Sequence, residues 1–591
     1  MARNRYDVDE VLETPFDFAH LKRSFVYIKK YKGKMITALV LSVFAAISGL
    51  LGPLITQYAL DNTIPQKNMG QLVLLTLAFV GTIAVSITFS TIRSRIMTVV
   101  GQDIIFDIRT DLFKHLQELP FEYYDNRPHG KILIRVVNYV NSVSDMLSNG
   151  IINVILECLN MLFIMIFMFF VNVKLSLVVL SGLPIFAVIM MMIKKRQRKA
   201  WQDVSNKSSN LNAYLQENIT GARVTQIFTR EEENAQIFDR LSEKYRKSWI
   251  NAVKYSNLVW PATDNVSTLV RAAIFVVGLL VLTPAAVSLG TIVAMTSYAS
   301  SFWQPIMNLS NIFNNFINNI AYLERIFETL DEPATIADKP NAQDIGDITG
   351  EVKFDDVTFS YEQGKTVLEH ISFDVKPGES VALVGPTGAG KSTVVSLLSR
   401  FYDLDSGKIT IDGKDISQAT LHSLRSQMGI MLQDSFIFSG TIYDNIRYGR
   451  LDATEEEIRE AAKIVCADEF INEMKDGYMT EVNERGSKLS GGQKQLISFA
   501  RTLLSDPKIL VLDEATSSID ARTEKLLQQG LQRLLVGRTS FIIAHRLSTI
   551  KNCDKIMYID NKGIAECGTH DQLIAKKGEY YKLYTAQHMD G

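Results

Sequence analysis

Six long runs of mostly apolar residues occupy the first half of the chain and restrict what it can fold into. They span residues 35–60, 71–92, 146–171, 173–193, 257–283 and 290–313. A helix that crosses the hydrocarbon core of a bilayer needs about 20 such residues, and its backbone polar groups must be satisfied within the helix. So many runs in one half disfavour buried core helices of a soluble protein. The sequence therefore predicts six membrane-spanning helices.

Lysine and arginine residues indicate the orientation of these helices, because cytoplasmic loops are enriched in them. Basic residues precede the first run, and "KKRQRK" (194–199) follows the fourth, whereas 61–70 and 283–290 carry one lysine between them. We therefore expect both termini to be cytoplasmic. The two inner connections, 93–145 and 194–256, are long and helical in pattern. They are too large to be turns, so we expect them to contact something in the cytoplasm.

Charge and cysteine spacing disfavour a nucleic-acid-binding protein and a cysteine metal site. The net charge is −2, so the chain has no overall basic signature for nucleic acid. Its four cysteines lack metal-ligand spacing and are typical of thiols in a reducing compartment. The first 34 residues do not resemble a cleavable signal.

The expected domains are a cytoplasmic segment (1–34), a membrane domain (35–330), a linker (331–349) and a nucleotide-binding domain (350–591).

A glycine-rich turn between a predicted strand and a predicted helix identifies the nucleotide-binding domain. Residues 385–392 form G-x-x-x-x-G-K-S, the phosphate loop. Its glycines let backbone N–H groups approach phosphate oxygens, Lys391 reaches the β- and γ-phosphates, and the Ser392 hydroxyl is placed for Mg²⁺. The expected nucleotide contacts here are Gly385, Pro386, Thr387, Gly388, Ala389, Gly390, Lys391, Ser392 and Thr393.

Candidate catalytic side chains follow other apolar strands. The strand in "KILVLDE" delivers Asp513 to its carboxyl end, where a Mg²⁺ ligand beside the phosphate loop is needed. The adjacent Glu514 could orient or deprotonate the attacking water. Three other residues are candidates for a functional role: His545, after a further strand, in catalysis, Gln433 as a contact to Mg²⁺ or water, and Tyr361 as a stacking partner for a base. On the residues alone, a structural role is favoured for each of them.

A second phosphate-binding turn occurs in "KLSGGQKQLISFAR", where a serine and two glycines begin a predicted helix. One chain thus carries two such turns but only one complete phosphate loop. Together with "GPTGAGKST", "ILVLDE" and "IIAHR", this segment resembles the ATP-binding cassette (ABC) transporters. The resemblance is to the exporter type, in which membrane spans are fused ahead of the cassette. The implied fold is an α-helical polytopic membrane domain followed by an α/β P-loop ATPase domain.

The resemblance implies a role for each motif. Tyr361 stacks on adenine, Gln433 communicates with the spans and contacts Mg²⁺, and His545 senses the γ-phosphate. Asp520 makes a contact across an interface between two chains. The residues that close over ATP held by the partner's phosphate loop are Ser490, Gly491, Gly492 and Gln493. The expected active unit is therefore a dimer with two interfacial ATP molecules, each with Mg²⁺.

The membrane half shares the resemblance. "FEYYDNRPHGKILIRVVN" and "LQENITGARVTQIFTRE" resemble the family's two cytoplasmic loops, whose short tip helices press on the cassettes. Two residues depart from the family pattern, Asn138 in the first loop and Asn483 ahead of the signature. Intact Glu514, His545 and Gln433 favour a homodimer over a heterodimer with a second half-transporter, although a heterodimer also contains one intact chain.

We expect ATP-driven export by alternating access, with a hydrophobic or amphipathic substrate: drug, lipid or peptide. The expected location is the cell membrane of a bacterium, among its lipids. A soluble DNA-repair or translation ATPase is disfavoured by the spans, and an ATP-gated channel by the presence of Glu514. An importer is disfavoured, because importers usually keep the membrane and ATP parts on separate chains. A peptide-processing exporter is disfavoured, because it would carry an additional N-terminal peptidase domain.

Polar residues inside the spans suggest a substrate path. Asn308, Asn311, Asn315 and Asn318 share one helical face of the sixth span. Glu157 in the third span and Arg271 in the fifth are expensive charges at similar expected depth, so we expect them to pair within or between chains. Asp264 is seven residues before Arg271 and is expected to lie too far along the helix for direct pairing.

Overall fold

The computed structural model describes residues 18–125, 127, 129–281, 287–362, 364–431, 435–483, 486–513, 521–543 and 550–589. Two compact units make up the chain. The first comprises residues 1–117 and 128–332, and the second residues 118–127 and 333–591. The described part of the first unit is helical, and the second combines strands and helices.

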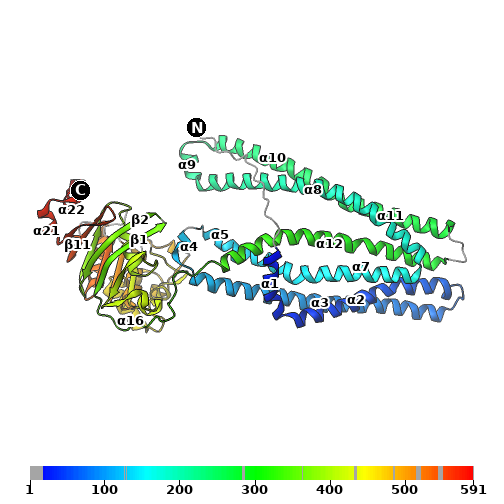
Figure 1. Ribbon diagram of the computed structural model, residues 1–591, viewed down its shortest axis with the longest axis horizontal. Coiled ribbons are helices and arrows are strands. Elements are labelled where there is room, and N and C mark those ends of the chain that lie inside the picture. Colours follow the sequence, from blue (N-terminus) through cyan, green and yellow to red (C-terminus); the bar gives the residue numbers. More distant parts are fainter. Residues whose placement is uncertain are drawn as a thin grey trace. The chain divides into compact units, whose positions relative to one another are not determined.

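Long helices build the first unit (Figure 1). They are α2 (Lys32–Tyr58), α3 (Met69–Glu118), α7 (Ile151–Val171), α8 (Val173–Thr220), α10 (Glu231–Asn257), α11 (Val259–Val276) and α12 (Leu289–Leu330). Shorter segments are α1 (Phe18–Lys30), α5 (His129–Ile134), α6 (Val140–Asp145), α9 (Ala222–Ile227) and the π-helical turns η1 (Ala59–Thr63), η2 (Arg135–Tyr139), η3 (Met146–Gly150) and η4 (Val277–Val281). Within the described residues, five helical stretches are long and apolar enough to cross a membrane. Helix α12 contains the sixth predicted span, which carries more serine, threonine and asparagine.

Side-chain caps explain where two of the spans begin. Asn172 alone separates α7 from α8, and its side chain accepts a hydrogen bond from the backbone N–H of Leu175 at 3.1 Å. Ser288 caps α12 in the same way through Thr291 N–H. Asp61 adds a second tie there, because its carboxylate accepts from Gly290 N–H at 2.9 Å. Polar caps of this kind satisfy backbone donors that a helix start leaves unpaired.

One apolar core is shared by α2, α7, α8, α11 and α12. In it α12 lies against α7 and α2, and α8 lies against α11. Outside this core α8 also lies against α10. Buried aromatic residues of α12 fill this core, among them Tyr298, whose hydroxyl donates to the Leu50 carbonyl at 2.6 Å. Helices α8 and α11 approach closely at Gly182, where an added Cβ would lie 2.6 Å from Val270 Cγ2. Small residues at such crossings are typical of membrane helix pairs.

The second unit contains a central six-stranded sheet in the order β12-β11-β3-β10-β9-β6. Its strands are β3 (Ser380–Val384), β6 (Met428–Met431), β9 (Ile509–Asp513), β10 (Thr539–Ile543), β11 (Lys555–Asp560) and β12 (Gly563–Gly568). Strands β11, β3, β10, β9 and β6 are parallel and β12 is antiparallel. A four-stranded antiparallel sheet is formed by β1 (Val352–Glu362), β2 (Lys365–Val375), β4 (Ser406–Ile411) and β5 (Lys414–Asp415).

Helices complete this unit. They are α4 (Phe121–Asp125), α13 (Lys391–Leu398), α14 (Leu421–Ser426), α15 (Ile442–Arg447), α16 (Glu455–Ile464), α17 (Asp468–Glu473), α18 (Gly491–Leu504), α19 (Ala521–Leu535), α21 (His570–Lys576) and α22 (Glu579–Met589), with 3₁₀ turns at Ile416–Gln418 and Gly477–Met479. A short strand pair, β7 (Gly440–Thr441) with β8 (Glu481–Val482), lies beside them.

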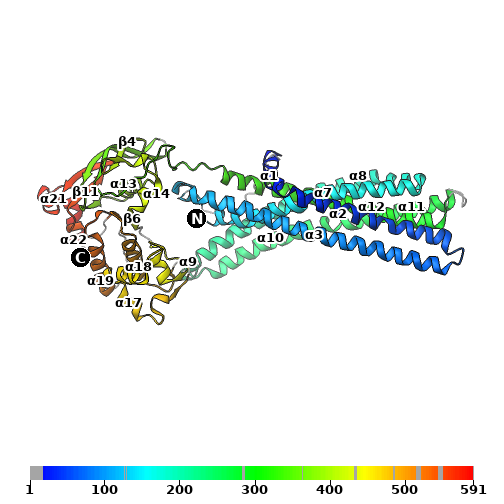
Figure 2. The same cartoon turned by 90° about the horizontal axis from the view of Figure 1, so that it is seen from below.

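The central sheet separates two apolar cores. Strand residues alternate between them, so that Leu383 packs with α13 and the four-stranded sheet while Ala382 and Val384 pack with α18 and α19. This alternation follows from the two-residue period of a strand. Figure 2 shows α13 and α14 on one side of β6, and α18 and α19 on the other.

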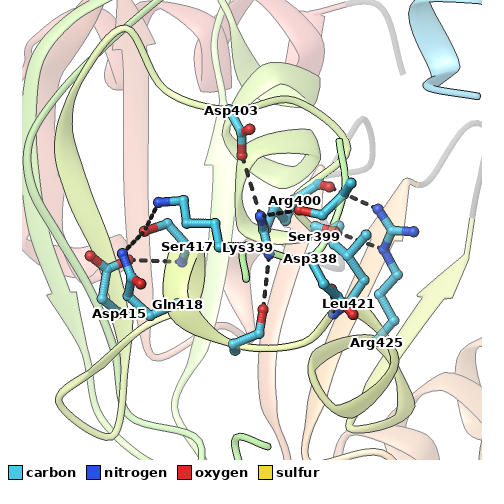
Figure 3. Close-up of polar contacts among 12 residues, drawn as sticks. Asp338, Lys339, Ser399, Arg400, Asp403, Asp415, Ser417, Gln418, Leu421 and Arg425 are labelled. Atoms are coloured by element: carbon cyan, nitrogen blue, oxygen red, sulfur yellow. Dashed lines mark hydrogen bonds and ion pairs between the residues drawn. The ribbon is translucent and has the colours of Figure 1, made fainter. Parts of the chain in front are cut away.

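A buried arginine attaches the segment after α12 to the second unit (Figure 3). Arg400 is only 2% exposed, and its guanidinium donates to the carbonyls of Ala419 at 2.9 Å and Ala337 at 3.0 Å and to Asp403 at 3.3 Å. Arg425 donates in turn to the Arg400 carbonyl at 2.8 Å. These bonds satisfy a charge that would otherwise be costly to bury.

Candidate functional site

The phosphate loop lies between β3 and α13, and two of its glycines are required by their surroundings. Gly385 has φ 144°, and a Cβ there would lie 2.1 Å from the Ile559 carbonyl oxygen of β11. Gly390 has φ 105°, and a Cβ would lie 2.6 Å from Leu368 Cδ2. Side chains at either position would be both strained and sterically excluded. The loop backbone is therefore held close to its neighbours in the shape that leads into the helix.

Lys391, the first residue of α13, lies folded over this loop. Its ammonium group donates to the carbonyls of Gly385 and Pro386, both at 2.9 Å, and the residue is 8% exposed. Burial lowers the pKa of the Lys391 ammonium, and the negative charge of Asp513 opposes that shift. A buried cation above a glycine loop at a helix N-terminus fits an oligophosphate, which supplies the missing negative charge.

Hydroxyl and carboxylate oxygens near this lysine suit a hard cation. Ser392 is exposed in the first turn of α13, and Asp513 ends β9. Oxygen ligands of these two types are what Mg²⁺ selects when it also binds phosphate. Ser392 and Asp513 are therefore the described residues that could hold the Mg²⁺ of a bound nucleotide.

Tyr361 is presented by a cluster of aromatic rings. Its ring lies edge-on to those of Phe359 and Tyr402, with centroids 4.9 and 5.1 Å away. Its hydroxyl is 3.1 Å from Thr393 Oγ1, which belongs to α13 directly after the phosphate loop. The residue remains 44% exposed. The predicted base-stacking residue is thus connected to the phosphate loop and keeps accessible surface for a base.

Four predicted site residues, Gln433, Glu514, Asp520 and His545, lie outside the described residues. The strands that precede three of them are described: β6 before Gln433, β9 before Glu514 and β10 before His545. These strands are parallel neighbours in register, so their carboxyl ends share the sheet edge at which β3 enters the phosphate loop.

The signature turn begins α18 with a complete capping box. Ser490 Oγ accepts from Gln493 N–H at 3.3 Å, and the Gln493 side chain accepts from Ser490 N–H at 3.0 Å. Gly491 is exposed, and an added Cβ there would meet open space. Because α18 and α13 lie on opposite faces of the central sheet, this accessible helix start belongs to a different side of the domain from Lys391.

Sequence reasoning did not identify the residues that receive the first cytoplasmic loop. Helix α4, the tip of that loop, belongs to the same compact unit as residues 333–591. Phe121 packs on Phe401 with ring centroids 4.4 Å apart, and the Tyr402 hydroxyl donates to Asp125 at 3.1 Å. The only local signal was the aromatic pair in "RFYD" directly after α13, which resembles ordinary core sequence.

The structure gives the partners of the two membrane charges within one chain. Glu157 accepts a hydrogen bond from Asn308 Nδ2 at 2.7 Å and does not pair with Arg271 within the chain. Arg271 instead donates to Thr268 at 2.8 Å and lies 4.0 Å from Asp264, so the expectation that Asp264 is out of reach was wrong. Helical side chains point toward the N-terminus, which lets a long arginine reach back two turns. A Glu157–Arg271 pair between two chains stays a prediction.

The asparagine face of α12 is partly described. Asn308 is half-buried, and Asn311 and Asn315 are exposed in the single chain. The Asn318 side chain lies outside the described residues. Ser297, Ser300 and Gln304 extend the exposed polar face along the helix, whereas Phe302 and Trp303 are buried on the other side.

Comparison with known proteins places these features in context. Residues 35–306 match the family described as ABC transporter transmembrane region, and residues 368–517 the family described as ABC transporter. The chain is 41% identical over 590 residues to the uncharacterized ABC transporter ATP-binding protein YknV of Bacillus subtilis, covering 100% of this chain and 98% of that protein. It is 37% identical over 495 residues to a fatty acid ABC transporter ATP-binding/permease protein of Mycobacterium bovis, covering 84% and 78%.

A solved structure shares the whole architecture. The structure of a bacterial Atm1-family ABC exporter with ATP bound superposes with a TM-score of 0.79 at 28% sequence identity, covering 94% of this chain and 98% of that one.

Proposed function

The chain belongs to the ABC transporter family, as a transporter ATPase with its membrane and ATP-binding domains fused, and we propose that it works as a homodimeric exporter. In this proposal, two ATP molecules with Mg²⁺ bind between the ATP-binding domains of two chains. The substrate is hydrophobic or amphipathic. The protein lies in a bacterial cell membrane with both termini in the cytoplasm, as the basic residues at 22–34 and 194–199 favour.

The position of the two phosphate-binding turns supports a composite site. Lys391 begins a helix on one face of the central sheet, and Ser490 begins a helix on the other. One domain therefore offers a phosphate loop without its own signature turn beside it. A second chain in the opposite orientation supplies Ser490, Gly491 and Gln493 to the first chain's loop, and receives the same in return.

The residues of one chain then have distinct tasks. Lys391 neutralises phosphate charge, while Ser392 and Asp513 hold Mg²⁺, which stabilises the charge of the transferring phosphoryl group. We assign Glu514 to the attacking water, with Gln433 and His545 beside it and Asp520 in the contact between chains. Clamping of the two domains would be passed to the spans through α4, which is already seated on Phe401 and Tyr402.

Exposed apolar residues at the other loop tip also favour a dimer. Helix α9 and its flanks expose Ile219, Val224, Ile227 and Phe228, each more than half accessible in the single chain. An apolar tip of this size in the cytoplasm needs a covering partner. We propose that it docks on the ATP-binding domain of the second chain, and that ATP binding and hydrolysis alternate the access of the substrate path.

The test is transport by purified protein reconstituted into lipid vesicles across a panel of drugs, lipids and peptides. We expect ATP-dependent uptake into vesicles whose ATP-binding domains face the bath. Glu514→Gln should bind Mg-ATP and lose most turnover, whereas Lys391→Ala should weaken ATP binding itself by removing a charge-assisted contact. Uptake by wild type that does not depend on ATP, or hydrolysis by Glu514→Gln at the wild-type rate, would refute the proposal or the assignment of Glu514.

A further inference from the structure

A single carboxylate lies between two polar stripes of the membrane unit. Helix α7 carries Asn153, Glu157 and Asn160 at spacings of four and three, all half-buried and on one face. The facing stripe of α12 includes Gln304 and Asn308. The stripes meet where Asn308 donates to Glu157 Oε1 at 2.7 Å, and Gln304 donates to Asn308 Oδ1 at 3.0 Å.

The negative charge of Glu157 is not neutralised within the described chain. The six predicted spans contain four charged residues: Glu157, Lys174, Asp264 and Arg271. Asp264 and Arg271 compensate each other on α11 at 4.0 Å. Lys174 is the second residue of α8, directly after the turn that ends α7. Among the described residues, the hydrogen-bond partner of Glu157 is the uncharged amide of Asn308.

The depth of Glu157 places it where a membrane-dissolved molecule can reach it from the cytoplasmic leaflet. At 1.5 Å per residue, Glu157 lies roughly 21 Å along α7 from Val171, where the helix ends on its outer side in the proposed orientation. The hydrocarbon core is about 30 Å thick, so Glu157 lies in its cytoplasmic half. An unpaired ionisable group inside a membrane is costly and marks a path or binding position.

We propose that Glu157, oriented by Asn308, binds the positive charge of a cationic amphipathic substrate that enters from the cytoplasmic leaflet. This inference rests on the proposed export function and narrows its substrate class. The neighbouring amides Asn153, Asn160 and Gln304 add no charge, so the position carries one net negative charge. A monovalent organic cation compensates that charge, whereas an anionic amphipath such as a fatty acid would be repelled.

The experiment compares two probes of the same shape and opposite charge, tetraphenylphosphonium and tetraphenylborate. Each is titrated into wild-type protein in lipid vesicles while ATP hydrolysis is measured. We expect tetraphenylphosphonium to stimulate hydrolysis and tetraphenylborate to have little effect. Glu157→Gln, which keeps the shape and removes the charge, should raise the half-maximal concentration of the cation about tenfold, which corresponds to about 1.4 kcal/mol.

Two variants control this result. Glu157→Asp keeps the charge and should retain the preference for the cation. Lys174→Gln removes a different charge from a span, at its outer end, and should leave the half-maximal concentration of tetraphenylphosphonium unchanged. Size-exclusion profiles and ATP-dependent thermal shifts identify variants that fail to fold.

Several outcomes would overturn the proposal. It fails if tetraphenylphosphonium has no effect on wild type, if tetraphenylborate or oleate stimulates equally well, or if Glu157→Gln responds like wild type. It also fails if Glu157→Gln and Arg271→Gln couple in stability alone, because Glu157 would then be a strut paired with the partner chain. ATP-dependent transport of uncharged or anionic molecules in these cases would leave the exporter proposal standing.

Discussion

Arg400 shows what one buried charge contributes to the ATP-binding unit. Its five donors are arranged in a rigid plane, which lets it reach the carbonyls of Ala337 and Ala419 and the carboxylate of Asp403 at once. A lysine at this position has a compact ammonium that cannot reach all three acceptors. We expect Arg400→Lys to destabilise this unit by about 3 kcal/mol, within the range for breaking a buried charge network.

Differential scanning calorimetry of the full-length protein measures this loss as a lower transition temperature. The matched control is Arg459→Lys on α16, whose side chain is 43% exposed and pairs with Glu455 on the same helix. Exposed pairs of this kind are worth a few tenths of a kcal/mol, so the control should change little. An equal effect of the two substitutions would show that the buried network of Arg400 adds no more stability than an exposed ion pair.

At the scale of elements, α4 is seated on Phe401 and Tyr402, and in the proposed mechanism this contact would pass motion to the first loop. Burial raises the pKa of Tyr402, and the negative charge of Asp125 raises it further, so the hydroxyl stays a donor at physiological pH. We expect Tyr402→Phe and Asp125→Asn each to reduce the stimulation of ATP hydrolysis by substrate. The double variant should be no worse than either single one, because both remove the same bond.

The readout is the ratio of stimulated to basal hydrolysis in lipid vesicles, with Tyr581→Phe in α22 as a control substitution. Additive losses would mean that Tyr402 and Asp125 act through separate contacts, and a stimulation ratio unchanged in all three variants would exclude a coupling role for the bond.

Helix α12 gives a second prediction at this scale. Ser301, Gln304, Asn311 and Asn315 are exposed along one face, and Phe302 and Trp303 are buried on the other. We expect single cysteines at 300–318 to react with a water-soluble thiol reagent in a helical pattern, strongest on the asparagine face, since that face would line the water-filled path. Uniform protection of all positions would exclude this lining role.

The success of sequence reasoning depended on how local each signal is. The phosphate loop and the capping box of α18 are specified within a few residues, because Gly385, Gly390 and Ser490 are required by backbone conformation or by helix capping. The seat of α4 on Tyr402 joins residues separated by 277 positions, which no local pattern reports. The expectation that Asp264 lies out of reach of Arg271 was wrong, because rise per residue alone neglects the direction in which an arginine side chain extends.

For the whole molecule, the decisive question is whether one ATP site uses two chains. Lys391→Ala removes the phosphate loop's charge, and Ser490→Arg blocks the signature turn. In a composite site, a mixed dimer of the two variants contains one intact site and one doubly damaged site. We therefore expect mixed dimers to hydrolyse ATP at a substantial fraction of the wild-type rate, whereas each variant alone is nearly inactive.

Tandem tagging isolates the mixed dimers for this measurement, and cysteines placed in the two motifs report their proximity by cross-linking. Cross-links confined to single chains, or mixed dimers as inactive as the separate variants, would contradict the composite site.

The bonds of Arg400 also determine how the molecule can be taken apart. The first strand of the ATP-binding unit begins at Val352. A fragment that starts there lacks Ala337, whose carbonyl accepts a hydrogen bond from Arg400, and Asp338, whose carboxylate accepts one from the Leu421 N–H. The excised piece would keep a guanidinium in its interior with one acceptor missing. A protease-stable, soluble fragment should therefore retain the 337–351 segment, so that the unit of independent folding is longer than its sheets suggest.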